Sequence, residues 1–205
     1  MKYIYPPRAE TKIAPESLPI FEKMGKFLAQ PKLNGSSTEI YFDDKGTVKT
    51  YNRHHDVISH KMDVKELESL HRGNGEMVLC GEYLNKNQKD ETGNYWNHKY
   101  VIWDIIVYEG KHLLGSSFEE RYKLLNKLYP DNPVKKHLHQ ISSNCYRINA
   151  ILSDFKSIFE DISKFDIYEG LVLKRLDGKL ENGTTENNNT RTQIKCRKGT
   201  KNYRF

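Results

Sequence analysis

One lysine of this chain, Lys32, lies in a short segment, QPKLNGSS (30–37), whose residues can aim its side chain into a cleft. Pro31 restricts the backbone just before it, and Gly35 permits conformations that other residues avoid just after it. A lysine amine is a nucleophile when neutral, and burial or neighbouring cations favour that form. Taken alone, the segment also suits an ordinary surface turn, so the rest of the chain must decide between these interpretations.

Further along the chain, charged residues recur at or near expected strand ends, in the segments YNR (51–53), CGEY (80–83), EGLVLK (169–174) and QIKCRK (193–198). The apolar residues before Glu82 predict its burial, and a buried carboxylate needs a partner or a metal. Because side chains alternate along a strand, Lys195 and Arg197 share one face and Lys198 points to the other. The ordinary alternatives are a solvated basic tail for the last segment and a turn carboxylate for Glu169.

With the tryptophan and aspartate at 103–104, these segments resemble, in the same order, the motifs of the covalent nucleotidyltransferase superfamily. Its members are ATP-dependent DNA ligases, RNA ligases and mRNA capping enzymes. Their motifs read KxDG, an arginine near a strand end, GE after a strand, an aromatic residue before Asp, EGxV and KxK. The resemblance covers about residues 28–198. It leans toward DNA ligases, because WDIIVYEGKHLLGSSFEERYKLL (103–125) is similar to their FDxxxxxG pattern and the helix that follows it.

The resemblance implies an ATP-dependent DNA ligase adenylation domain, in which Lys32 attacks the α-phosphorus of ATP and becomes a lysyl-AMP. AMP would then pass to a 5′-phosphate at a nick in double-stranded DNA, where a 3′-hydroxyl displaces it. Each step is an in-line displacement at phosphorus, so the protein mainly positions groups and neutralises charge. Lys195, with Arg197 or Lys198, would contact the α-phosphate. Arg53 would bind ribose or the acceptor 5′-phosphate.

The same resemblance implies roles for the other site residues. Glu82 would serve ribose or a metal and Glu169 a metal, and two carboxylates with phosphate and water oxygens suit Mg²⁺. Trp103, where phenylalanine is more usual, could stack on adenine while also packing in the core. Gln30 could accept a hydrogen bond from the adenine amino group. The implied nucleotide-binding residues are Gln30, Pro31, Lys32, Leu33, Arg53, Glu82, Trp103, Lys195 and Arg197.

Two residues of the first segment depart from the motif. Asn34 stands where Asp is commonest, which removes a charge but keeps the turn. Ser37 stands where DNA ligases and capping enzymes carry an arginine that helps to hold the nucleotide and the nick. The KLNGSS form is closer to RNA ligases. Two alternatives therefore stay open: an RNA ligase of the same superfamily, and a catalytically weak nucleic-acid-binding domain that depends on a partner.

The hydrophobic pattern predicts the elements that hold these residues. Strands are expected at 26–30, 38–42, 48–51, 78–84, 100–108, 170–174 and 193–197. A DDKG turn (43–46) joins the second strand to the third. Helices are expected at about 64–70, 118–129 and 154–165, with start signals from Asp63, from a capping box of Ser117 and Glu120, and from Ser153.

Strands and helices mixed without regular βαβ alternation indicate an α+β domain of mostly antiparallel sheets flanked by helices. The resemblance implies the ATP-grasp-like nucleotidyltransferase fold. Residues 1–25 are expected to form an N-terminal arm, and the polar stretch 177–192 a mobile surface loop. The expected core residues are Ile40, Val78, Leu79, Val101, Ile105, Leu124, Leu128, Phe155, Ile158, Leu171 and Leu173.

The chain has 205 residues and a net charge of +6, which allows one domain with a modest positive surplus for nucleic acid. Part of that surplus lies in the C-terminal run RTQIKCRKGTKNYRF (191–205). DNA ligases and capping enzymes follow KxK with an OB-fold, for which no length remains here. We therefore expect one adenylation domain over 1–205, without an OB-fold, in which the arm around Arg8 could compensate.

The cysteines Cys80, Cys145 and Cys196 are odd in number and far apart, which argues against a disulfide framework or a zinc site. We expect them to be reduced residues of the core. No run of about twenty apolar residues occurs, and the N-terminus lacks the features of a signal peptide, so a membrane architecture is excluded. A cytoplasmic, monomeric protein is expected.

Overall fold

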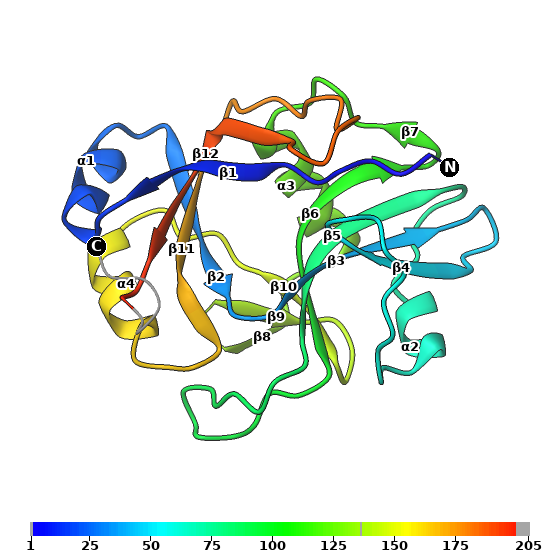
Figure 1. The fold of residues 1–205 in the computed structure, drawn as a ribbon, viewed down its shortest axis with the longest axis horizontal. Coiled ribbons are helices and arrows are strands. Elements are labelled where there is room, and N and C mark those ends of the chain that lie inside the picture. Colours follow the sequence, from blue (N-terminus) through cyan, green and yellow to red (C-terminus); the bar gives the residue numbers. More distant parts are fainter. Residues whose placement is uncertain (1, 136, 200–205) are drawn as a thin grey trace.

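The computed structural model describes residues 2–135 and 137–199 and contains two β-sheets that lie side by side (Figure 1). Residues 200–205 of the basic C-terminal run are outside the described part. The smaller sheet has the strand order β1-β12-β11-β2. Its strands are β1 (Arg8–Ile13), β12 (Asn189–Arg197), β11 (Tyr168–Arg175) and β2 (Phe27–Leu33).

The larger sheet has the order β4-β3-β5-β6-β10-β9-β8, and a short strand, β7, also pairs with β6. Its strands are β4 (Val48–Asn52), β3 (Ser36–Phe42), β5 (Met77–Leu84), β6 (Lys99–Tyr108), β7 (Lys111–His112), β10 (Cys145–Ile148), β9 (Leu138–Gln140) and β8 (Pro133–Lys135). Only the pairs β1–β12 and β6–β10 are parallel among the described strands. The expected α+β class with mostly antiparallel sheets is confirmed, and the described residues include no OB-fold.

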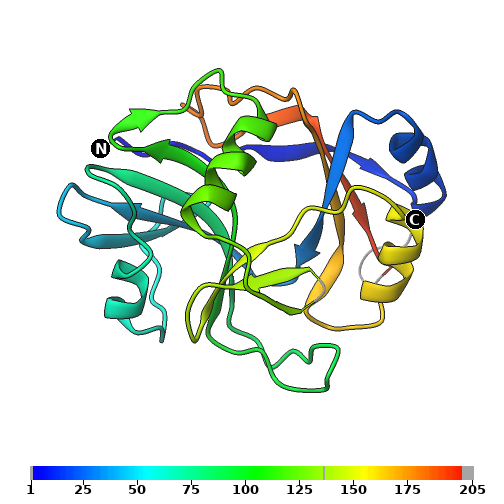
Figure 2. The same ribbon diagram turned by 180° about the vertical axis from the view of Figure 1, so that it is seen from behind.

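Short helices flank both sheets: η1 (Pro15–Ser17), α1 (Leu18–Lys23), α2 (Val64–Glu68), α3 (Phe118–Leu128) and α4 (Phe155–Ile162). Helix α3 packs on β6 of the larger sheet, while α4 and α1 pack together beside the smaller one (Figure 2). The Asp63 cap and the capping box of Ser117 and Glu120 are confirmed.

The expected cap of α4 by Ser153 is wrong. Asp154 occupies the N-cap position in a left-handed conformation and its side chain makes no cap hydrogen bond. The backbone N–H groups of Asp154 and Phe155 donate instead to the carboxylate of Glu22, at 2.8 and 2.9 Å. A distant acceptor therefore satisfies donors that a local cap usually serves.

The core divides between the two sheets, and the residues expected in it contact it. Most of those residues are fully buried, whereas Leu124, Leu128 and Ile158 are only partly buried because they lie toward the outer face of their helices. All three cysteines are buried and unpaired, as expected. No helix of the described part is long and apolar enough to cross a membrane.

Two segments that were expected to lie outside the sheets contribute strands to the smaller sheet. The stretch 177–192, expected to be a loop, enters β12 at Asn189. The segment 1–25, expected to be an arm, contains β1, which pairs in parallel with β12. Its residues RAETKI alternate between charged side chains and small or apolar ones, but none of them is fully buried, so this edge strand is held mainly by its backbone. Before β1, the backbone N–H of Tyr5 donates to the carbonyl of Gly183 at 2.8 Å, which ties the two segments together.

Candidate active site

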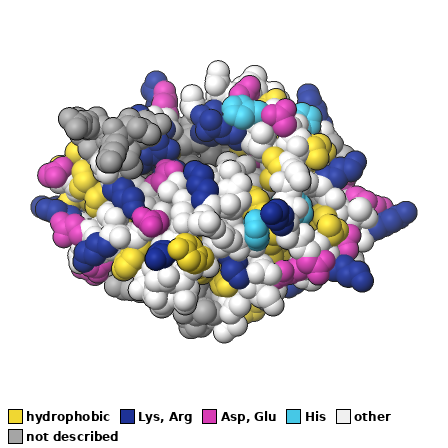
Figure 3. Space-filling view, turned by 60° about the horizontal axis from the view of Figure 1, so that its bottom comes forward, with side chains coloured by type: hydrophobic (Ala, Val, Ile, Leu, Met, Phe, Trp, Pro, Cys, Tyr) yellow, Lys and Arg dark blue, Asp and Glu magenta, His cyan; other side chains and the backbone are white. Residues whose placement is uncertain are grey.

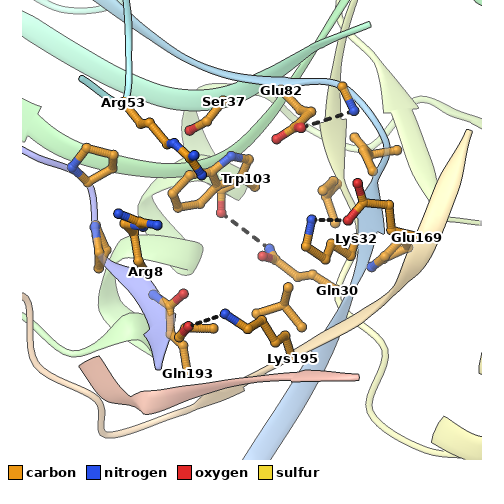
Figure 4. Close-up of a pocket in the computed structure, with 18 of the residues that line it drawn as sticks. Arg8, Gln30, Lys32, Ser37, Arg53, Glu82, Trp103, Glu169, Gln193 and Lys195 are labelled. Carbon is orange, nitrogen blue, oxygen red and sulfur yellow. Dashed lines mark hydrogen bonds and ion pairs between the residues drawn. The ribbon is translucent and has the colours of Figure 1, made fainter. Parts of the chain in front are cut away.

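A cavity of about 530 Å³ lies between the two sheets (Figure 4). It is lined by every residue that the sequence assigned to the site: Gln30, Pro31, Lys32, Leu33, Arg53, Glu82, Trp103, Glu169, Lys195 and Arg197. Strands β2 and β3 are consecutive in the chain but belong to different sheets. The junction between them therefore brings Lys32, near the end of β2, to face the larger sheet.

The junction requires a glycine at position 35. A Cβ on Gly35 would lie 2.5 Å from the backbone oxygen of Tyr83 and 2.9 Å from the side chain of Glu82. Real Cβ atoms do not approach a backbone oxygen so closely. The backbone N–H of Gly35 donates to Oε1 of Glu82 at 3.1 Å. The same glycine thus lets the chain pass and orients a cavity carboxylate.

Lys32 forms an ion pair with Glu169, with Nζ 2.5 Å from Oε2. Nε of Arg197 lies 3.3 Å from the same carboxylate oxygen. Strand register explains this meeting, because Lys32 on β2 and Arg197 on β12 are both partners of Gly170 on β11. Gly170 has a φ of +138°, and a Cβ there would collide with the carbonyl oxygen of Cys196. Glu169 therefore lies between the cations of Lys32 and Arg197, and no residue larger than glycine fits beside it at position 170.

Glu82 lies on β5 opposite Ser37 on β3 and is partly buried in the cavity wall. Burial raises the pKa of its carboxyl to about 7, against the opposing effect of nearby Lys32, and Glu169 adds to the rise. Among the described residues, no cluster of three or more His, Cys, Asp or Glu side chains could hold a metal ion. Glu82 and Glu169 together supply two oxygen donors, so a metal here would need further oxygens from a ligand and water.

The shifted pKa of Glu82 predicts a pH-dependent cost to stability. Between pH 4.5 and about 7 the unfolded chain loses this proton while the folded chain keeps it, so the free energy of unfolding falls as pH rises. Relative to Glu82→Gln, the wild type is expected to lose about 2 kcal/mol between pH 4.5 and 8, since each pKa unit is worth 1.36 kcal/mol and solvent reduces the effect. Urea unfolding of both proteins measures it, and a constant difference across this range would contradict the assignment.

The inner end of the cavity is formed by Gln30, Trp103 and Lys174. Nζ of Lys174 donates to the backbone oxygen of Trp103 at 3.2 Å and lies 4.5 Å from the centre of its ring. The same Nζ also lies 4.4 Å from the centre of the Phe118 ring. Burial lowers the pKa of Lys174 to about 8. Gln30 donates to the same backbone oxygen at 3.4 Å, and its buried Oε1 has no hydrogen-bond partner in the described structure.

Sequence reasoning assigned no function to Lys174, although it ends the EGLVLK segment. Val172 and Lys174 share one face of β11 and both line the cavity. The alternation of side chains along that strand could have indicated a place for Lys174 in the site, because it predicts that Lys174 and Val172 point to the same side. A lysine that is 3% exposed is unusual, and its contacts with two aromatic rings account for its burial.

In the segment QIKCRK (193–198), the basic side chains point to opposite sides of the strand, as the alternation of side chains predicts. Lys195 and Arg197 line the cavity, and Nζ of Lys195 donates to the backbone oxygen of Ala9 at 2.9 Å. Burial, together with the cations Arg197, Lys12, Arg8 and Lys32, lowers the pKa of Lys195. Lys198 points elsewhere and donates to the carbonyls of Ser163 and Phe165. Arg197 is therefore the second basic residue of this segment that faces the cavity.

Two further cations stand near the mouth of the cavity. Arg53 follows β4, and its Nε donates to Nε2 of His54 at 3.0 Å. Arg8 reaches the cavity from the start of β1 and is labelled on the opposite side from Lys32 in Figure 4. Ser37 also lines the wall, and its hydroxyl donates to buried Glu39 at 3.0 Å.

Comparison with known proteins identifies the family of this chain. A protein-family model described as RNA ligase matches residues 25–196, which span the motif segments from QPKLNGSS to the first four residues of QIKCRK. The chain belongs to the RNA ligase family. The resemblance to the covalent nucleotidyltransferase superfamily, which includes RNA ligases, is confirmed. A comparison with curated proteins finds no match.

Solved structures share the fold of this RNA ligase family chain. A mycobacterial DNA ligase D complexed with ATP and MES has a TM-score of 0.63 at 18% identity, over 95% of this chain and 60% of that one. The Chlorella virus DNA ligase–adenylate gives 0.54 at 16% identity, over 95% and 69%. The ATP-dependent DNA ligase of bacteriophage T7, complexed with ATP, gives 0.55 at 14%, over 94% and 68%. The chain spans about 60% of the mycobacterial structure, and the shared part is the ligase nucleotidyltransferase fold.

Proposed function

We propose that residues 1–205 form the adenylation domain of an ATP-dependent polynucleotide ligase, with Lys32 as the residue that carries AMP. The observation that carries this proposal is the contact of Lys32 with Glu169 inside a cavity where Arg197 and Lys195 also face inward. A nucleophile, a carboxylate and two cations thus meet where a nucleotide phosphate would fit. The order of motifs and the family match support the same activity.

In the proposed reaction the Lys32 ammonium first loses a proton to solvent, and the resulting neutral amine attacks the α-phosphorus of ATP. The N–P bond forms, the bond from that phosphorus to the bridging oxygen of the β-phosphate breaks, and its electron pair leaves with pyrophosphate. The attacking nitrogen then loses a proton to solvent, which leaves a phosphoramidate. Lys195 and Arg197 would stabilise the charge on the α-phosphate oxygens, since charge-assisted hydrogen bonds are the strong ones.

The inner end of the cavity suits the adenine base. The buried Oε1 of Gln30 lacks a partner among the described residues and can accept from the exocyclic amine of adenine. The ring of Trp103 offers a surface for stacking beside it. A guanine carries a carbonyl oxygen at the corresponding position, so two acceptors would face each other. We therefore propose ATP rather than GTP as the nucleotide.

We propose Mg²⁺ as the metal of this site, held by Glu82 and Glu169. Carboxylate, phosphate and water oxygens are the ligands that Mg²⁺ prefers, and both carboxylates line the cavity. The ion would neutralise negative charge on the phosphates. Because burial favours the neutral form of Glu82, with a pKa of about 7, metal binding is expected to strengthen as pH rises through that value.

A nick with a 5′-phosphate in double-stranded DNA is the proposed acceptor. The WDIIVYEGKHLLGSSFEERYKLL segment and the DNA ligases of similar fold support it. Lys and Arg side chains also gather around a hollow on the face shown in Figure 3, where phosphates could bind. RNA at the nick is the second candidate, favoured by the RNA ligase family model and by Ser37 in place of an arginine.

Two assays on the purified chain test the proposal. With α-labelled ATP and Mg²⁺, the protein is expected to retain label through denaturing electrophoresis, and absence of label would leave only a nucleic-acid-binding domain. Sealing of a 5′-phosphate nick is then compared between an all-DNA duplex and one with RNA on the 3′-hydroxyl side. Faster sealing of DNA supports the proposed acceptor. Equal or faster sealing of the RNA end would make RNA the substrate.

A further inference from the structure

Arg8 reaches the cavity from a segment that carries none of the motifs. It is the first residue of β1 and pairs in register with Asn189 on β12. Its backbone N–H donates to the carbonyl of Asn188 at 2.9 Å, and the side-chain amide of Asn188 donates to the backbone oxygen of Tyr5 at 2.7 Å. These bonds to Asn188 hold the backbone at Arg8 and just before it, and the pairing of Ala9 with Thr190 holds the backbone just after it.

Neither of the carboxylates that line the cavity forms an ion pair with Arg8. Six Lys and Arg side chains line it against two carboxylates, and one of these, Glu169, is shared by Lys32 and Arg197. Within the described residues, the Arg8 guanidinium forms no hydrogen bond or ion pair. A guanidinium in a concave site with surplus positive charge favours a polyanion, because it donates to two oxygens at once.

The position of Arg8 relative to Lys32 indicates which anion it would bind. In an in-line displacement the leaving group departs on the side opposite the nucleophile. Figure 4 shows Arg8 across the cavity from Lys32, with Arg53 beside it. On the basis of the proposed adenylation, we propose that Arg8 binds the β- and γ-phosphates of ATP and stabilises pyrophosphate as it leaves.

A second source of the same phosphate chemistry is the terminal 5′-phosphate of the acceptor. Both ligands present phosphate oxygens to a guanidinium, but at different steps of the reaction. Pyrophosphate is present only when AMP is loaded onto the protein, and the 5′-phosphate only when AMP leaves it. Experiments on the separate steps therefore distinguish them.

Equilibrium binding tests the contact without any transfer of AMP. The ligand α,β-methylene-ATP cannot release pyrophosphate, and AMP lacks the outer phosphates. Arg8→Ala is expected to weaken binding of α,β-methylene-ATP about 10- to 100-fold, as for loss of a charge-assisted contact, and binding of AMP less than 2-fold. Arg8→Lys should recover part of the lost affinity, since lysine keeps the positive charge but cannot donate two parallel hydrogen bonds as a guanidinium does. Equal losses for both ligands, or none, would overturn the proposal.

The matched control is Arg191→Ala. Arg191 lies on β12, next to β1, but its side chain is 91% exposed and does not line the cavity. Its replacement removes the same charge from the same sheet, so a long-range effect of net charge would appear in both variants. We expect Arg191→Ala to bind both ligands within 2-fold of wild type. Urea unfolding of the Arg8 variants verifies that they fold.

A kinetic experiment separates the two phosphate sources. Pre-adenylated protein is treated either with pyrophosphate, which re-forms ATP, or with a 5′-phosphate nick, which accepts AMP. Arg8→Ala is expected to raise the pyrophosphate concentration needed for half-maximal discharge about 10-fold and to transfer AMP to the nick at a rate within 2-fold of wild type. The reverse pattern would overturn the proposal and assign Arg8 to the acceptor. If wild type forms no adenylate, the proposed function fails, while the binding experiment still tests Arg8.

Discussion

Replacing Lys32 with alanine is expected to abolish covalent transfer of AMP to the protein, lowering its single-turnover rate at least about 10³-fold. The other lysines that line the cavity cannot take its place. Lys174 is buried with its Nζ on the Trp103 carbonyl, and Lys195 donates to the carbonyl of Ala9. Lys32 is also the cavity lysine that contacts Glu169.

Label from α-labelled ATP, followed through denaturing electrophoresis and mapped by proteolysis and mass spectrometry, measures the effect. Lys32→Arg is the conservative comparison, because it keeps the charge but supplies no neutral amine, and it should be as inactive as Lys32→Ala. Retention of label by Lys32→Ala would show that another residue carries AMP.

Arg197→Ala and Lys198→Ala form a matched pair within the same experiment. Arg197 faces Glu169 in the cavity, whereas Lys198 donates to the carbonyls of Ser163 and Phe165. Arg197→Ala should reduce the rate of labelling about 10-fold or more, and Lys198→Ala less than 2-fold. Equal losses would mean that the orientation of this strand does not determine which cation assists the transfer.

Breaking the buried ion pair between Asp104 and Arg121 is expected to cost about 3–5 kcal/mol of unfolding free energy. Nε and Nη2 of Arg121 donate to the two oxygens of Asp104 at 2.9 and 3.0 Å, and the side chains are 3% and 0% exposed. Nη1 donates to the carbonyl of Ser116, and Asp104 also accepts from the backbone N–H of Ile105. Removing either partner leaves a charge buried without its counter-ion.

Urea unfolding of Asp104→Asn, Arg121→Met and the double variant tests this. Each single replacement should lose several kcal/mol, and the double variant should lose clearly less than their sum, because no unpaired charge remains. Additive losses would contradict a direct coupling. The exposed pair of Arg175 and Asp177, with side chains 42% and 67% exposed, is the control, and Asp177→Asn should cost less than 1 kcal/mol.

This ion pair also supports the proposed nucleotide site. Asp104 follows Trp103 directly on β6, and Arg121 lies on α3, so the pair fixes the strand to the helix behind the cavity. The backbone oxygen of Trp103 accepts from Gln30 and Lys174. Asp104 and Arg121 thus have a structural role, because they hold the wall on which the base is proposed to lie.

Much of the site follows from the sequence alone, because it depends on residues close together in the chain. The capping box at Ser117 and the turn before Gly46, whose φ is +80°, involve spans of a few residues. The alternation of β12 sends Lys195 and Arg197 one way and Lys198 the other. Local backbone geometry governs each of these features, so residue type and spacing were enough to predict them.

Only the tertiary structure decides which distant residues meet. Glu169 reaches Lys32 across 137 positions of sequence because β2 pairs with β11 in one particular register. The same long-range packing buries Lys174 between Trp103 and Phe118 and brings Arg8 to the cavity on an edge strand that has no fully buried residue. Strand register and burial are set by the packing of the whole chain, so local spacing determined the kinds of chemical group in this protein and the fold determined their partners.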